Sequence, residues 1–175
     1  DSNKKNEALK YSAEAINASR EKLLDANNQD MEEASKNNLQ NSFVDRLELN
    51  SGRIDSMISG IDKIINLEDP VGNKTKPHIS PSGFEVSKMR VALGVVGIIY
   101  ESRPNVTADA SALCLKSGNA SILRGGSEAS KSNRVIESCM QEGLERAGLS
   151  KLAIQLIKNQ DRKLVEQMIK MENYI

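Results

Sequence analysis

The sequence predicts an α/β fold in which a helical N-terminal lead-in precedes a parallel sheet with flanking helices. Apolar residues recur at helical spacing through residues 1–66. The apolar run Val95–Tyr100, a helical pattern and the short apolar run Ala120–Leu123 then follow one another, which is the order of a βαβ unit. Because the first run is rich in β-branched residues and has no polar face, we expect a strand buried on both faces.

The lead-in is expected to fold into several amphipathic helices. Residues 2–28 predict one or two helices, residues 30–36 a separate short helix ended by Asn37-Asn38, and Phe43–Leu47 another. Asn50-Ser51 has residue types that begin helices, and an apolar stripe at helical spacing follows it. The lysines and glutamates of this region are interpreted as solvated helix faces.

Residues 67–91 are expected to connect the lead-in to the sheet. Prolines and a glycine prevent a helix up to Pro81 and indicate an irregular segment. Residues 84–91 then alternate apolar and polar side chains, which predicts a strand at an edge or in a protruding position. His78, the one histidine, has no nearby carboxylate in sequence, so we expect a surface residue and not a general base.

Two further helices with a strand between them are predicted after the βαβ unit. Ser127-Glu128 begins the first helix and Gly148 ends it. Ala153–Ile157 is a third apolar strand, and the second helix covers Asn159–Met171. Tyr174-Ile175 is expected to begin a fourth strand.

The composition narrows the class of protein. With 38% hydrophobic and 27% charged residues, the 175-residue chain is expected to be one globular domain or a large piece of one. The 24 basic and 24 acidic residues balance, which gives no reason to expect nucleic acid or a membrane as partner. No apolar run approaches the roughly 18 residues of a membrane span, and no signal peptide is recognised. One histidine excludes a multi-histidine metal site, and no metal is predicted.

The two cysteines form no CxxC pair, which predicts a reduced, cytoplasmic protein with buried thiols. Cys114 and Cys139 both fall at apolar positions of predicted helices. A nucleophilic thiol needs exposure and a lowered pKa, so we interpret both cysteines as core residues.

Two turns after predicted strands hold the residues best suited to chemistry. Arg124-Gly125-Gly126-Ser127-Glu128 places a cation, two glycines and a hydroxyl before a helix, which suits an anion, although a tight turn alone explains the glycines equally well. In Ser102-Arg103-Pro104-Asn105, the amide of Asn105 can donate to an oxyanion. From spacing alone, Asn105 more simply caps a helix beginning near Val106. Neither GxGxxG nor a Walker motif is present.

The stretches Tyr100–Asn105 and Leu115–Gly126 resemble the γ-glutamyl phosphate reductases (glutamate-5-semialdehyde dehydrogenases), a branch of the aldehyde dehydrogenase superfamily. The resemblance covers nearly the whole chain, because matching patterns recur at residues 27–30, 45–47, 67–72 and 159–162. It implies an incomplete aldehyde dehydrogenase-like cofactor lobe. The implied parts are a helical lead-in (1–66), a connection and oligomerisation strand (67–91) and a Rossmann-like NADP-binding core (92–175).

The resemblance also implies a reaction: NADPH reduces L-glutamyl 5-phosphate to glutamate 5-semialdehyde and phosphate in proline biosynthesis. In the family a cysteine displaces phosphate to form a thioester, and hydride transfer then releases the aldehyde. Asn105 matches the oxyanion-hole asparagine, and Ser102, Arg103 and Pro104 match backbone positions that line the cofactor cleft. Arg124 matches the basic residue that reaches the adenosine ribose.

The second turn bears on the choice of cofactor. Gly125 belongs to the implied cofactor-binding turn, and Ser127 stands where NAD-preferring relatives often hold a glutamate. A glutamate would repel a 2′-phosphate, whereas Arg124 with Ser127 would accept one, so NADP is the expected cofactor. Phe84–Arg90 matches strand material used in oligomerisation, so a homo-oligomer is possible.

The sequence departs from the family pattern in two respects. Ala92 stands where the family usually has proline. Neither Cys114 nor Cys139 matches the catalytic cysteine, which is expected downstream of the motif matched by Lys170–Ile175. The chain is therefore expected to be an inactive fragment that lacks the nucleophile.

Other interpretations remain open. A non-catalytic nucleotide-binding module would use the same two turns, whereas a helical interaction protein would use residues 3–66. Binding of NADPH separates the last interpretation from the others. The reductase half of a bifunctional synthase is a related alternative, although Tyr100 and Asn105 favour the stand-alone bacterial form.

Overall fold

The N-terminal helices begin where the sequence supplies capping side chains. The computed structural model describes residues 1–37 and 39–175. The Asp1 carboxylate accepts from the Lys4 amide at the start of α1 (Ser2–Ala18), and Asn50 Oδ1 accepts from the Arg53 amide at the start of α4 (Ser51–Ile65). Between them lie α2 (Arg20–Lys36) and α3 (Asn41–Leu47). The helices predicted within residues 2–28, at Phe43–Leu47 and after Asn50 are confirmed.

Because α2 is one continuous helix, the prediction of a separate helix at residues 30–36 is wrong. The Asp30 carboxylate accepts hydrogen bonds from the amides of Lys131 (3.2 Å) and Ser132 (2.8 Å), at the start of α6 (Ser130–Arg146). Asp30 therefore caps a helix that is distant in sequence and does not interrupt its own. Asn37 follows the last residue of α2, as predicted, and Asn38 lies outside the described residues.

Asn27 fixes α2 to the segment that leads into α4. Its Nδ2 donates to the Leu47 carbonyl (2.9 Å), and its Oδ1 accepts from the Leu49 amide (2.7 Å). Asn27 is buried, so each polar atom of its amide needs such a partner. The link between α3 and α4 is thereby held against the helical layer.

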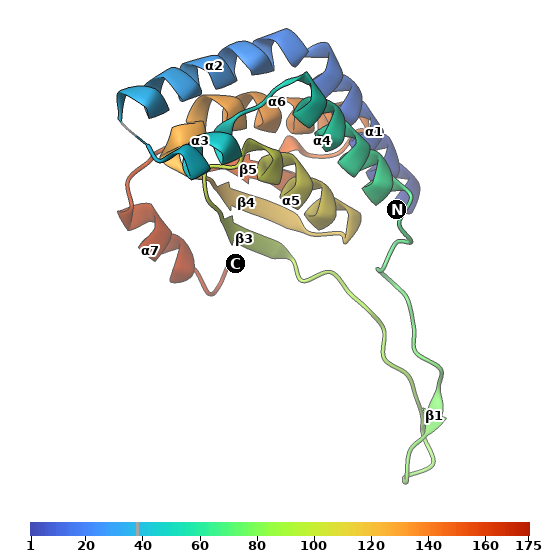
Figure 1. Ribbon diagram of the computed structural model, residues 1–175. Helices are drawn as coiled ribbons and strands as arrows, with labels where there is room; N and C mark the ends of the chain where they lie inside the picture. The colour runs from blue at the N-terminus through green and yellow to red at the C-terminus, as the bar shows by residue number, and fades with distance from the viewer. Residues whose placement is uncertain (38) are drawn as a thin grey trace.

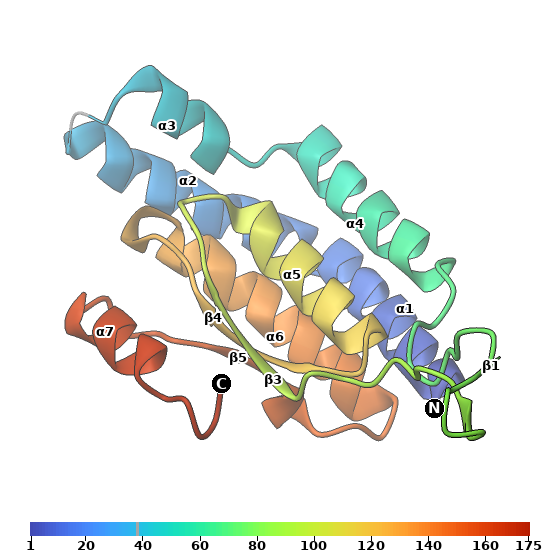
Figure 2. The ribbon, with the colours of Figure 1, turned by 90° about the horizontal axis from the view of Figure 1, so that it is seen from below.

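A parallel sheet follows, with the order β3-β4-β5 in the described chain. Its strands are β3 (Val95–Ile99), β4 (Ala120–Arg124) and β5 (Ile154–Leu156), which confirms the three strands predicted in this region. α5 (Pro104–Lys116) joins β3 to β4, and α6 joins β4 to β5. Both crossover helices lie on one face of the sheet, together with α1 and α4 (Figures 1 and 2).

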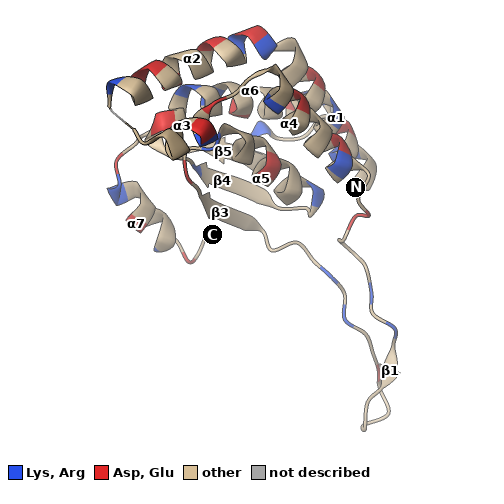
Figure 3. Cartoon of the chain, viewed as in Figure 1, with Lys and Arg blue, Asp and Glu red and all other residues tan. Residues whose placement is uncertain are grey.

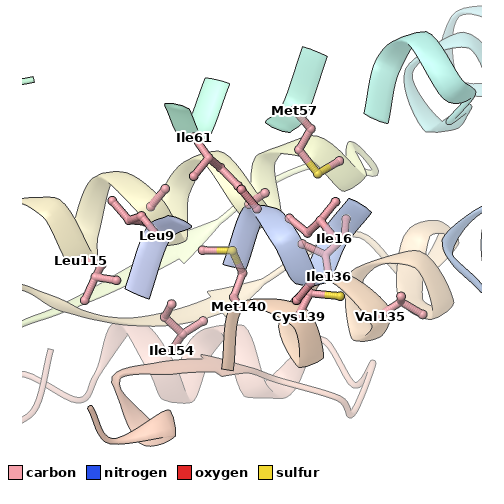
Figure 4. Close-up of a cluster of buried hydrophobic side chains, with 14 of the residues drawn as sticks. Leu9, Ile16, Met57, Ile61, Leu115, Val135, Ile136, Cys139, Met140 and Ile154 are labelled. Carbon is pink, nitrogen blue, oxygen red and sulfur yellow. The ribbon is translucent and has the colours of Figure 1, made fainter. Parts of the chain in front are cut away.

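The main hydrophobic core fills the space between the sheet and these helices (Figure 4). α1 and α6 approach to backbone contact within it, because a Cβ on Gly143 would lie 2.6 Å from the Ala8 carbonyl oxygen. The residues of this core include Leu9, Ile16, Ile54, Ile61, Leu115, Leu123, Ile136, Met140, Leu144 and Ile154. The core sets the position of the carboxyl edge of the sheet relative to the helices.

β3 is half-buried, so the expectation of a strand buried on both faces is wrong. In the described chain it forms one edge of the sheet, with only β4 as a neighbour, and Ile99 is 49% exposed. An apolar run does not reveal which strand of a sheet has only one neighbour. On its other face, an added Cβ at Gly97 would lie 2.6 Å from Met168 of α7 (Lys163–Ile169).

The C-terminal residues form a turn, so the predicted fourth strand is wrong. The amides of Tyr174 and Ile175 donate to the Met171 carbonyl (2.8 and 3.0 Å). The Ile175 side chain lies against Gly97, and this packing accounts for its apolar character. The helix predicted at Asn159–Met171 is present but shorter.

A hairpin arm projects from the body of the molecule between α4 and β3 (Figure 1). It pairs β1 (His78–Ile79) with β2 (Glu85–Val86) in antiparallel fashion. The protruding position is confirmed, but the strand predicted at residues 84–91 is reduced to β2 and one isolated bridge. The segment predicted to be irregular contains β1. His78 is exposed on this arm, as predicted.

Two residues near the start of the Leu115–Gly126 stretch stabilise the amino ends of the strands. This edge of the sheet lies opposite the turns that hold the candidate site residues. Buried Lys116 donates through Nζ to the Ile65 carbonyl (2.8 Å) and to Asn6 (2.7 Å). Asn119 Oδ1 accepts from two successive main-chain amides just before β3 (2.6 and 2.9 Å). These side chains therefore have structural roles.

Acidic and basic residues are interspersed along the outer helices (Figure 3). Lys10, Glu21 and Glu32 are among the exposed ones, which confirms the solvated helix faces. Among the described residues, every helix is too short or too polar to cross a membrane.

Candidate functional site

The two predicted turns lie side by side at the carboxyl edge of the sheet. Ile99 at the end of β3 is in register with Arg124 at the end of β4. The Tyr100 amide donates to the Arg124 carbonyl (3.0 Å) and extends this pairing into the turns. In open parallel sheets this edge is where ligands bind.

Close packing explains the two glycines of the second turn. A Cβ on Gly126 would lie 3.0 Å from the Ser102 amide nitrogen and would also collide with the Ser102 hydroxyl. A Cβ on Gly125 would lie 2.5 Å from Asn133 Nδ2 and 3.0 Å from the Tyr100 ring. Neither glycine has a positive φ, so packing and not backbone conformation requires them.

A carboxylate and a hydroxyl join the turns. Ser102 Oγ donates to Glu128 Oε2, and Ser127 Oγ donates to Glu128 Oε1 (3.1 Å). Burial acts to raise the pKa of the Glu128 carboxyl, but the hydrogen bonds from Ser102, the Glu128 amide and Ser127 outweigh burial and lower the pKa. Glu128 is therefore held ionised between the turns. Sequence reasoning gave it no role beyond a helix start, because its partner Ser102 lies 26 residues away.

A series of hydrogen-bonded polar side chains packs against the two turns. Tyr100 Oη shares a hydrogen bond with Thr107 Oγ1 (2.7 Å), which donates to Asn133 Oδ1 (2.9 Å). Burial raises the pKa of Tyr100 to about 12, so the hydroxyl stays neutral. Asn133 in turn contacts the Gly125 position. Sequence analysis missed Thr107 and Asn133, since neither side chain has a local signal.

A cleft of about 440 Å³ opens beside the second turn, and we call it the glycine-turn cleft. Its lining includes Arg124, Gly125, Ser127 and Arg162. The Arg124 guanidinium donates to the carbonyls of Gly125 and Gln160 (3.1 Å for the latter). Within the described chain its buried Nε has no partner. Arg162 and Ser127 are exposed at this cleft.

A second cleft of about 510 Å³ lies beside the first turn, and we call it the asparagine cleft. Asn105 lines it as the second residue of α5, which begins at Pro104. The helix therefore starts two residues earlier than predicted. Asn105 Nδ2 donates to Asp109 Oδ2 (3.1 Å), so the predicted capping role of Asn105 is wrong.

Charged groups of both signs surround the asparagine cleft. Arg46 pairs with Glu101 (2.9 Å), and Arg53 pairs with Asp45 (2.8 Å). Arg103, one residue before α5, lies 3.8 Å from the same Glu101 carboxylate. Such a cleft offers both cations and anions to a ligand that itself carries both charges.

The structure thus sorts the predicted site residues into two groups. Ser102, Arg124, Gly125 and Ser127 gather at the glycine turn, whereas Arg103 and Asn105 face the asparagine cleft. Pro104 is buried and begins α5.

Both cysteines are buried, which confirms the sequence interpretation. Cys114 is 8% exposed and Cys139 is 3% exposed. Burial raises the pKa of each thiol, so neither is activated as a thiolate. In the described residues, no group of three side chains is arranged to hold a metal ion.

Comparison with known proteins points to one enzyme family. No family model matches the chain. Among solved structures, the chain superimposes over 100% of its length on the γ-glutamyl phosphate reductase of Thermotoga maritima (TM-score 0.95, 42% identity), covering 42% of that protein. The Saccharomyces cerevisiae γ-glutamyl phosphate reductase gives a TM-score of 0.90 at 28% identity over 100% of this chain and 45% of that protein.

A more distant structure shares the fold. An aldehyde dehydrogenase of Listeria monocytogenes gives a TM-score of 0.68 at 16% identity, covering 99% of this chain and 36% of its own length. The chain spans less than half the length of each of these proteins. Over its whole length the chain is therefore similar to the γ-glutamyl phosphate reductases, it matches a part of such a protein, and it shares its fold with an aldehyde dehydrogenase.

Proposed function

We propose that this chain forms the cofactor-binding and oxyanion-stabilising part of an enzyme in proline biosynthesis. That enzyme reduces L-glutamyl 5-phosphate with NADPH to L-glutamate 5-semialdehyde and phosphate. The observation that carries the proposal is the 42% identity to a γ-glutamyl phosphate reductase over the entire chain. The two clefts at the carboxyl edge of the sheet give this reaction a place for the cofactor and a place for the substrate.

The residues of the glycine-turn cleft fit a dinucleotide. Gly125 and Gly126 let the second turn pack closely against Ser102 and Asn133, and both glycines line the cleft just before a helix, where an anion is favoured. Arg124 lines the cleft, and its buried Nε lacks a partner in the described chain. When bound, the cofactor supplies the hydride that reduces the acyl carbon.

Selection of NADPH over NADH is assigned to the cations of this cleft. Position 127 holds a serine and not a carboxylate, and the cations Arg124 and Arg162 offset the two glutamates, Glu128 and Glu166, that also line the cleft. Arg124 is largely engaged with main-chain carbonyls, whereas Arg162 offers an exposed guanidinium at the same cleft. We therefore include Arg162 among the residues that contact the phosphate.

Asn105 is assigned to the acyl group. Its Nδ2 would donate to the carbonyl oxygen of the substrate as this oxygen becomes negative during attack and hydride transfer. The attacking thiol is neither Cys114 nor Cys139, because both are buried among the helices. We therefore propose that residues 1–175 alone do not catalyse the reaction.

The asparagine cleft suits the amino-acid part of the substrate. L-Glutamyl 5-phosphate carries an ammonium, a carboxylate and a phosphate group. Arg46, Arg53 and Arg103 provide cations around the cleft, and Asp45 and Glu101 provide anions. A ligand with both charges would exchange partners with these pairs without burying an unpaired charge.

The hairpin arm is assigned to association between copies of the protein. Ile79 is 68% exposed and Phe84 is 72% exposed, and the short strands leave backbone groups unpaired at the edges of the arm. We propose that the arm packs against a second copy in a homo-oligomer.

Two measurements test the proposed function. The full-length protein is assayed for phosphate-dependent oxidation of glutamate 5-semialdehyde with NADP, the reverse of the proposed reaction, and for binding of NADPH by fluorescence. Turnover that Asn105→Ala lowers strongly is the expected result. Binding without turnover would instead support a non-catalytic nucleotide-binding module, and absence of binding would overturn the proposal. Residues 1–175 alone are expected to give no turnover, and turnover by them would refute the assignment of the thiol.

A further inference from the structure

Asn105 and Asp109 form a hydrogen-bonded pair on the face of α5 that lines the asparagine cleft. They are one helical turn apart, and Asn105 Nδ2 lies 3.1 Å from Asp109 Oδ2. The other carboxylate oxygen, Oδ1, faces α4, because a Cβ added to Gly60 would lie 3.4 Å from it. The carboxyl group is therefore confined between α4 and the amide of Asn105.

A structural role does not explain why an aspartate stands here. Burial raises the pKa of the Asp109 carboxyl, and the hydrogen bond from Asn105 compensates only in part. None of the ion pairs found among the described residues includes Asp109. An amide–carboxylate pair at this spacing stabilises a helix only slightly. The fold thus retains a half-buried carboxylate that weakens it, which is a property of functional positions.

We propose that Asp109 is a positioning residue that holds the amide of Asn105 in the orientation needed to bind an oxyanion. The inference rests on the proposed role of Asn105. A carboxylate only accepts hydrogen bonds, so the NH₂ end of the amide must face Asp109 and the oxygen of the amide is turned away. One hydrogen of Nδ2 is then bonded to Asp109, and the other is left for the substrate oxygen. Without Asp109 the amide is free to rotate and to present its own oxygen to the oxyanion, which would repel it.

A double-mutant cycle in the full-length protein tests this role. The variants are Asn105→Ala, Asp109→Ala, the double variant and Asp109→Asn, with Asp62→Ala as control because Asp62 is an exposed aspartate of α4 outside both clefts. Asn105→Ala is expected to lower kcat by about a hundredfold or more. Asp109→Ala is expected to lower kcat by about tenfold with little change in KM, because the oxyanion exists only in the transition state. In the Asn105→Ala background, Asp109→Ala should have no further effect.

Thermal unfolding distinguishes a positioning role from a structural role, because the loss of a structural contact would lower the melting temperature. Asp109→Ala should melt at the temperature of the wild type or above it, since the substitution removes a desolvated carboxylate. Asp109→Asn should be intermediate in kcat, because its amide offers an acceptor but does not exclude the flipped orientation of Asn105. Asp62→Ala should leave kcat and KM unchanged.

The possible failures are distinguishable. If Asp109→Ala lowers kcat equally in both backgrounds, or leaves kcat unchanged, Asp109 does not position Asn105, while the oxyanion role of Asn105 stands. If Asp109→Ala lowers both the melting temperature and the activity, Asp109 is structural and the inference is overturned. If Asn105→Ala leaves kcat unchanged, the oxyanion role in the proposed function fails, and the inference fails with it.

Discussion

The carboxylate of Asp30 in α2 accepts hydrogen bonds from both the amide and the hydroxyl of Ser132 in α6, at 2.8 and 2.7 Å. These residues are 102 positions apart in the sequence, and the pair is buried. Asp30 thus performs the function of an N-cap for α6 from another helix, and it fixes the start of α6 just after the glycine turn. This contact holds α2 against α6.

Asp30→Ala is therefore expected to destabilise the protein by about 2 kcal/mol, because buried amides at the start of α6 lose their acceptor. Chemical denaturation of the variant and of the wild type at neutral pH measures the difference. Asp25→Ala, an exposed aspartate on the same helix, is the matched control and should change stability little. Equal stability of the two variants would mean that water replaces Asp30 as acceptor.

The ion pair between Lys5 and Asp69 is expected to make stability depend on pH in the acid range. The hydrogen bond from Lys5 Nζ, at 2.6 Å, lowers the pKa of the Asp69 carboxyl below its ordinary value of 3.8. The unfolded state therefore binds this proton more readily than the folded state does. The contribution of Asp69 is fully present above about pH 4 and is lost as the pH falls through its folded-state pKa.

Asp69→Asn tests this dependence. At neutral pH the variant should be less stable than the wild type by about 1 kcal/mol or less, since pairs near the surface contribute little. The difference should shrink as the pH is lowered below 4, as measured by urea unfolding at a series of pH values. A constant difference over this range would contradict the assignment.

Gly126→Ala is expected to abolish or strongly weaken NADPH binding. The new methyl group would collide with Ser102 and displace the first turn relative to the second. Gly52→Ala in α4 is a suitable control, because its Cβ would meet Asn50 Oδ1 at an ordinary 3.5 Å. The control should retain binding and be as stable as the wild type or more so, since alanine favours the helix. If a titration shows unchanged NADPH binding by Gly126→Ala, the turn is not part of the cofactor site.

Arg162→Ala is expected to raise the Kd for NADPH by about tenfold or more and to leave that for NADH unchanged. The reason is that a charge-assisted contact to the 2′-phosphate exists only with NADPH. Arg124→Ala should weaken the binding of both cofactors, because its guanidinium holds the Gly125 and Gln160 carbonyls around the cleft. Lys163→Ala, the next exposed cation in sequence, serves as control. An equal loss for NADPH and NADH in Arg162→Ala would place Arg162 away from the 2′-phosphate.

Local patterns revealed much of this architecture. The start of α4 after Asn50 follows from residue types and spacing over a few positions. The same is true of the strands Val95–Ile99 and Ala120–Arg124. The two turns that hold the candidate site residues are predictable because each follows a strand directly in the sequence. The burial of Cys114 and Cys139 was predictable because both lie on apolar helical stripes.

Two of the incorrect predictions share a physical cause, which is that a side chain contacts a partner outside its own segment. Asp30 has the residue type of a local helix cap, but it caps α6. Asn105 is a different case, because its capping residue type is used for a hydrogen bond to Asp109 within its own helix, α5. Ile175 resembles the start of a strand, but its side chain covers Gly97.

The sequence by itself therefore determined the fold class, the relationship to a reductase family and the two turns that carry the candidate chemistry. The tertiary structure decided how these residues are grouped. It separated Asn105 from Arg124 into different clefts, directed the Arg124 guanidinium onto main-chain carbonyls and placed Glu128 between the turns. The physical reason is that secondary structure depends on neighbours within a few residues. The orientation and ionisation of a polar side chain, in contrast, depend on groups that only the packing of distant segments brings within hydrogen-bond distance.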